Sequence, residues 1–97
     1  MRKPYADYAC FALRAYFDET QPCQQSEAEQ RNMAACEKVC QLQEERTLNI
    51  LKDIYQRRDM MSDIIYQVSK ERNIPQNDLW TLIAKIEKLF AKERGLI

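Results

Sequence analysis

The sequence predicts an all-α protein, and three observations lead to this fold class. The 97 residues include only one glycine and three prolines, so few positions can form the tight turns that a sheet needs. Ala, Leu, Gln, Glu, Lys and Arg are abundant, and these residues favour helices. Apolar residues recur at intervals of three and four along most of the chain, which is the spacing of one helix face.

The chain is long enough for one compact domain with a thin core. We expect three parts within it. They are an N-terminal helix and linker over residues 1–25, a long central helix within 26–58, and a helix-turn-helix-like unit over 59–97.

The first helix is predicted over residues 4–19 and is rich in aromatic residues. Pro4 suits a first helical turn, where its missing N–H costs nothing. Pro22 then interrupts the pattern and marks a linker. Because apolar groups cover several sides of this helix, it is either an internal core helix or a helix that also contacts a second subunit. The candidate interface residues are Tyr5, Tyr8, Phe11, Tyr16 and Phe17, together with Trp80 near the other end of the chain.

A second helix is predicted to begin after Ser26. Ser26 and Glu29 have the spacing of a capping box, in which a hydroxyl and a carboxylate satisfy free backbone donors. The helix is expected over residues 27–58. Its polar stretch at 41–47 is compatible with a solvent-crossing span, a bend, or the meeting point of two helices.

Two further helices are predicted over residues 61–72 and 76–94, separated by a short turn. Asp59 or Ser62 is the expected N-cap of the first, and Gly95 the expected C-cap of the second.

This pair has the layout of a helix-turn-helix. Ser69 is small enough for close helix approach, and Asn73 tolerates a positive φ. Ile74 is apolar and follows in the turn, while Leu79 and Ile83 have the spacing of core positions in the second helix.

The run VSKERNIPQNDLWTLIAKIEKLFAKE resembles the region-four domain of bacterial sigma factors and the short phage transcription activators similar to it. Val68-Ser69 corresponds to an Ile-Ala pair of that family, and Asn73-Ile74-Pro75 corresponds to its Gly-Ile-Ser turn. Arg72 departs from the pattern, since the family usually has Leu there. The resemblance covers the last half of the chain and leaves residues 1–47 unexplained. It implies binding to promoter DNA and contact with RNA polymerase.

A DNA-binding role predicts which side chains face the duplex. Gln and Asn can pair with adenine, and Lys or Arg can contact guanine or phosphate. The exposed face of the last helix and the residues before the motif then supply the candidate DNA contacts Arg57, Arg58, Gln76, Asn77, Thr81, Lys85 and Lys88. Trp80 is expected near DNA or at a protein interface.

Charge balance favours a different interpretation. The chain carries 15 basic and 15 acidic side chains, whereas DNA-binding domains usually have a basic excess. Charges sorted by face would reconcile the two. The alternative function is a helical oligomeric adaptor without DNA binding, and a homo-oligomer fits either function.

Neither an enzyme nor a metal protein is predicted. The chain has no histidine, which removes the commonest general base, and no cofactor loop is recognisable. Its four cysteines lack paired zinc-knuckle spacing. We expect no cofactor and no metal, and we expect Cys10, Cys23, Cys36 and Cys40 to be reduced thiols. The N-terminal segment does not resemble a secretory signal, and no apolar run is long enough for a membrane span, so we expect a cytoplasmic protein.

Overall fold

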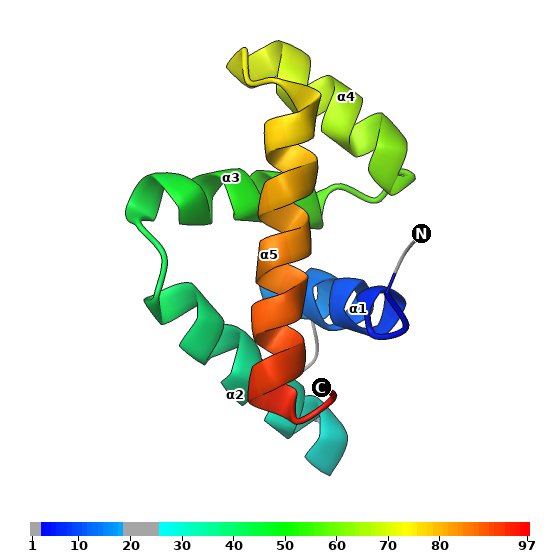
Figure 1. Cartoon of the computed structure of the whole chain (residues 1–97), viewed down its shortest axis with the longest axis vertical. Coiled ribbons are helices and arrows are strands. Elements are labelled where there is room, and N and C mark those ends of the chain that lie inside the picture. The colour runs from blue at the N-terminus through cyan, green and yellow to red at the C-terminus, as the bar shows by residue number, and fades with distance from the viewer. Residues whose placement is uncertain (1–2, 19–25) are drawn as a thin grey trace.

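The computed structural model describes residues 3–18 and 26–97, and within these ranges the chain forms five α-helices and no strand. The helices are α1 (Ala6–Phe17), α2 (Glu27–Gln41), α3 (Glu45–Gln56), α4 (Met61–Arg72) and α5 (Gln76–Arg94) (Figure 1). The all-α prediction is therefore confirmed. No helix in this part of the chain combines the length and the apolar composition that crossing a bilayer requires.

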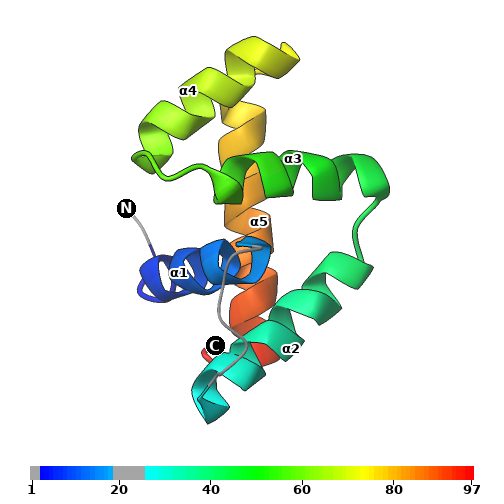
Figure 2. The same ribbon diagram turned by 180° about the vertical axis from the view of Figure 1, so that it is seen from behind.

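Helix α5 is the axis around which the other helices are arranged. Figures 1 and 2 show α1 and α2 beside its C-terminal half, while α3 and α4 lie toward its N-terminal half. The apolar stripe of α5 explains this arrangement. Leu79, Ile83, Ile86 and Phe90 recur at three- and four-residue intervals, and each is at most 2% exposed. Burying a stripe that runs along so much of the helix requires partners at both of its ends.

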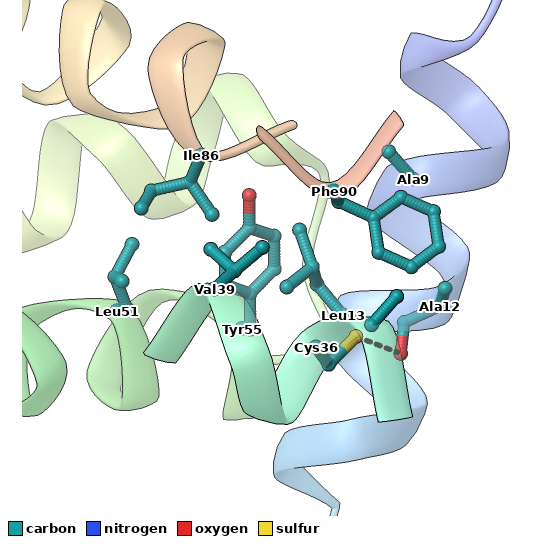
Figure 3. Close-up of a cluster of buried hydrophobic side chains, with 10 residues drawn as sticks. Ala9, Ala12, Leu13, Cys36, Val39, Leu51, Tyr55, Ile86 and Phe90 are labelled. Carbon is teal, nitrogen blue, oxygen red and sulfur yellow. Dashed lines mark hydrogen bonds between the residues drawn. The ribbon is translucent and has the colours of Figure 1, made fainter. Parts of the chain in front are cut away.

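The larger hydrophobic core, here called the first cluster, joins four helices (Figure 3). Helix α1 contributes small residues, which allow its backbone to approach its neighbours closely. In Figure 3, the Phe90 ring of α5 lies against this face of α1. The first cluster consists of Ala9, Ala12, Leu13, Ala35, Cys36, Val39, Leu51, Tyr55, Ile86 and Phe90.

A second cluster packs α3 and α4 against the N-terminal half of α5. Its members are branched aliphatic residues, which pack densely with few rotamers. The second cluster consists of Ile50, Ile54, Ile64, Ile65, Val68, Leu79 and Ile83. Helices α3 and α5 contribute to both clusters, so the two cores form one continuous unit.

The single long helix expected over residues 27–58 is wrong, because the chain forms α2 and α3 instead. Of the interpretations left open for the polar stretch 41–47, the meeting point of two helices is the observed one. Helix α2 ends at Gln41 with Leu42 as its C-cap, and Leu42 is 69% exposed. Glu44 has an extended conformation with ψ 156°. The break has a physical reason, since α3 must turn back toward α5 to bury Ile50 and Leu51.

The helix ends confirm two of the predicted caps and correct a third. The Ser26 side chain accepts a hydrogen bond from the backbone N–H of Glu29 at 3.2 Å. Gly95 closes α5 in the left-handed conformation with φ 76°. The N-cap of α4 is Met60, without a side-chain hydrogen bond, rather than Asp59 or Ser62. Packing of the buried residues of α4 outweighs the capping preference at this position.

Truncating the shared core should destabilise the whole protein. We expect Ile86→Ala to lower the free energy of unfolding by about 2–5 kcal/mol, because Ile86 is fully buried in the first cluster. Leu42→Ala should change it by less than about 0.5 kcal/mol, since Leu42 is largely exposed. Urea unfolding followed by circular dichroism measures both. If both substitutions lowered the free energy of unfolding by the same amount, burial of the apolar stripe of α5 would not be what stabilises the fold.

Candidate nucleic-acid interface

The turn between α4 and α5 is a tightly closed left-handed cap. Asn73 has φ 55° and ψ 46°, which confirms the positive φ expected from the sequence. The Ile74 N–H donates to the Ser69 carbonyl at 3.1 Å, and the Ser69 hydroxyl donates to the Ile74 carbonyl. Ser69 thus ties the last turn of α4 to the start of α5, and the relative position of the two helices is set by hydrogen bonds as well as packing.

The second cluster supports this pair of helices from behind. Leu79 and Ile83 are 1 and 2% exposed, which confirms their predicted core positions, and Val68 is fully buried beside them. Ile74 is partly buried and packs against the same cluster. Helix α3 completes it through Ile54. The N-terminal half of α5 therefore rests on a dry core, and its other face is turned to solvent.

The five predicted DNA contacts on α5 are all exposed, namely Gln76, Asn77, Thr81, Lys85 and Lys88. All but the first follow one another at three- and four-residue intervals, so they lie on one helix face. Lys92 extends this row by one more turn and is also exposed. The sequence reasoning missed Lys92, although its four-residue spacing from Lys88 was the available signal. We call Asn77, Thr81, Lys85, Lys88 and Lys92 the α5 row.

Trp80 lies beside this row rather than on it. Its side chain is partly buried and packs against the second cluster. The indole ring thus contributes to the core that holds α5, while part of it remains at the surface.

The two arginines before the motif differ in their surroundings. The Arg57 guanidinium donates to Asp53 on its own helix at 3.0 Å and to both carboxylate oxygens of Glu71 on α4 at 2.9 and 3.0 Å. Arg72 donates to the other oxygen of Asp53 at 3.0 Å. These residues form an ion-pair network between α3 and α4, which leaves little of the Arg57 guanidinium for another ligand.

Arg58, in contrast, has a side chain that is 81% exposed. It forms an ion pair with Asp18 at 3.2 Å, which links the segment before α4 to the end of α1. Of the candidate DNA contacts, Asn77, Thr81, Lys85 and Lys88 are thus brought together on one face of α5, while Gln76 is exposed but lies outside this row. Arg57 and Arg58 instead connect elements of the protein to one another.

The ion-pair network shifts the pKa values of its members. Partial burial acts to raise the pKa of Asp53, but hydrogen bonds from Arg72 and Arg57 outweigh it and hold the pKa below its ordinary value. The hydrogen bond from Arg57 likewise lowers the pKa of Glu71. The Arg57 pKa is raised, mainly by the hydrogen bond to Glu71. All these groups are therefore charged at neutral pH.

The predicted interface aromatics of α1 lie mostly against the protein itself. The Phe17 ring stacks on Tyr55 with centroids 5.9 Å apart, and the Tyr8 ring is 6.3 Å from Phe90. Tyr16 and Phe17 pack against the first cluster, and Tyr5 is half-buried. Phe11 differs, with 67% of its surface exposed.

The described cysteines are placed for packing. Burial raises the pKa of the Cys36 thiol to about 12, so it stays protonated, and its Sγ contacts the Ala12 carbonyl at 3.9 Å. Burial also raises the pKa of Cys40. Cys10 is half-buried, and Cys23 lies outside the described residues. No group of three or more potential metal ligands occurs within residues 3–18 and 26–97.

The ion-pair network predicts a specific loss of stability in acid. The pKa of Asp53 is lower in the folded protein than its ordinary value of 3.8, so ionised Asp53 stabilises the fold at pH values above 3.8. This stabilisation disappears as the pH falls through the folded-state pKa. Asp53→Asn should lower the free energy of unfolding by about 1–2 kcal/mol at pH 7 and by much less at pH 2. Urea unfolding at both pH values measures this difference.

Glu37→Gln is the matched control, because Glu37 is exposed on α2 and outside the network. It should have a small effect at both pH values. An Asp53→Asn effect that is the same at pH 7 and pH 2 would rule out a charge-dependent contribution from the network.

The chain was compared with known protein families, curated proteins and solved structures. No protein family matches the chain, and neither a curated protein nor a solved structure matches it at a significant level.

Proposed function

We propose that this protein is a sequence-specific DNA-binding transcription regulator that uses α5 as its recognition helix. The observation that carries the proposal is the α5 row, a continuous polar and basic face on a helix whose opposite face is fully buried. The tight turn at Asn73 between α4 and α5 supports a helix-turn-helix interpretation of this pair. The resemblance to sigma region four supports the same function and suggests RNA polymerase as a further partner.

The order of residues along α5 suits the two kinds of contact that DNA recognition requires. The amides of Gln76 and Asn77 are in the first turn, where recognition helices approach base edges. The lysines follow toward the C-terminus. Lys92 lies about 16 Å beyond Thr81 along the helix, far enough to reach phosphates at the side of a major groove. Amides would therefore read bases while lysines bind the backbone.

The zero net charge is compatible with this proposal because the charges are unevenly distributed. The acidic Asp53 and Glu71 are paired with Arg57 and Arg72 between α3 and α4. Lys85, Lys88 and Lys92, by contrast, share one exposed face of α5. A duplex on this face would meet a locally basic surface.

The test is a salt titration of duplex binding. Fluorescence anisotropy of a labelled mixed-sequence duplex should show binding that weakens steeply with salt. The double variant Lys85→Gln/Lys88→Gln should bind at least tenfold more weakly at low salt. Its slope of log affinity against log salt should be shallower by about two, since each phosphate contact contributes about 0.9.

The matched control is Lys38→Gln/Lys52→Gln. It also removes two positive charges, but from α2 and α3 rather than from α5. It should leave both the affinity and the slope nearly unchanged. Equal losses in the two double variants would mean that only total charge matters. No binding by the unmodified protein at low salt would reject the proposal.

An oligomeric adaptor is the second candidate, favoured by the 67% exposure of Phe11 and by the balanced charge. Phe11 would then be buried between subunits. Analytical ultracentrifugation should show a dimer at micromolar concentrations, and Phe11→Ser should shift it toward the monomer. A monomer at all concentrations, together with salt-sensitive DNA binding, would exclude the adaptor.

A further inference from the structure

A groove lies where the C-terminal half of α1 meets α2 and the end of α3. Its volume is about 680 Å³, which is within the range of small-molecule sites. Ala12 and Phe17 of α1, Met33 of α2 and Tyr55 of α3 provide apolar lining, and Arg14 and Arg58 also line it. Asp18 and Glu29 line it as well, so the groove combines an apolar wall with charged groups of both signs.

Arg14 is the unusual residue in this groove. Its side chain is half-buried, and its Nη2 donates to the backbone carbonyl of Asp59 at 3.1 Å. Its Nε is shielded from solvent and has no hydrogen-bond partner. Arg14 belongs to none of the ion pairs found in the described part of the chain. A half-buried cation without a carboxylate is unfavourable unless something else balances it.

The other two cations of the groove are already paired with carboxylates. Arg58 pairs with Asp18 at 3.2 Å, and the Arg57 guanidinium is held by Asp53 and Glu71. The Glu29 carboxylate accepts a hydrogen bond from the Ser26 hydroxyl at 3.2 Å. Within this set, Arg14 and Glu29 have no ion-pair partner among the described residues. Glu29 is exposed to solvent, whereas the Arg14 side chain is half-buried, so Arg14 is the unpaired charge that water solvates less well.

We propose that this groove binds a small organic carboxylate with an apolar body, such as an aromatic acid. The carboxylate approaches the Arg14 guanidinium, which is suited to planar bidentate pairing with such a group. The apolar body lies against Phe17, Met33 and Tyr55. This site is separate from the α5 row and does not rest on the proposed DNA binding.

The test compares two probes of nearly the same size and shape, one with a charged carboxylate and one with a neutral amide. Titration of the ¹⁵N-labelled 97-residue chain with 3-phenylpropionate should shift the backbone amide signals around Arg14 and Phe17. The expected dissociation constant is about 1 mM or lower, and 3-phenylpropionamide should bind at least about tenfold more weakly. Arg14→Gln should remove the preference for the acid over the amide.

A second variant keeps the test decisive if Arg14→Gln does not fold. Ala15 lines the groove and is on a helix, so Ala15→Leu should fill the space without disfavouring α1. It should abolish binding of both probes, while Ala34→Leu on the exposed face of α2 should have no effect. Equal affinity for acid and amide would overturn the proposal. So would unchanged binding in Ala15→Leu, or the absence of shifts at 10 mM probe.

Discussion

The whole structure depends on the burial of one long apolar stripe on α5. The helix has 19 residues and is about 28 Å long, so a single neighbouring helix cannot cover it. The first cluster covers Ile86 and Phe90, and the second cluster covers Leu79 and Ile83. The remaining helices pack against α5 within these two clusters. The chain breaks between α2 and α3, so that α2 packs in the first cluster and α3 contributes to both.

The same burial produces the candidate functional face. A helix with one face fully buried presents its opposite face in a fixed orientation, and here that face is the α5 row. Asn73 and Ser69 fix the entry of the chain into α5. The ion-pair network centred on Asp53 and Arg57 then joins α4 to α3 at the surface. Packing and charge pairing thus act together to hold α5 in a fixed position.

Local pattern predicted much of the candidate site. The bounds of α4 and α5 follow from apolar periodicity, from Asn73 in the turn and from Gly95 at the end. The exposure of Asn77, Thr81 and Lys85 follows from the same periodicity. Contacts between distant residues could not be predicted this way. Arg57 was expected to face DNA, but the structure pairs it with Glu71, 14 residues away, because α3 and α4 pack side by side.

The sequence by itself determined the helical class, the left-handed turn at Asn73 and the faces that each helix buries, because these depend on residues at most a few positions apart. Tertiary structure alone decided the break after Gln41 and the Arg57 network. It also decided the groove around Arg14, whose guanidinium meets the carbonyl of Asp59, 45 residues later. Such features arise only when helices pack, since packing sets which distant side chains share a dry or charged environment.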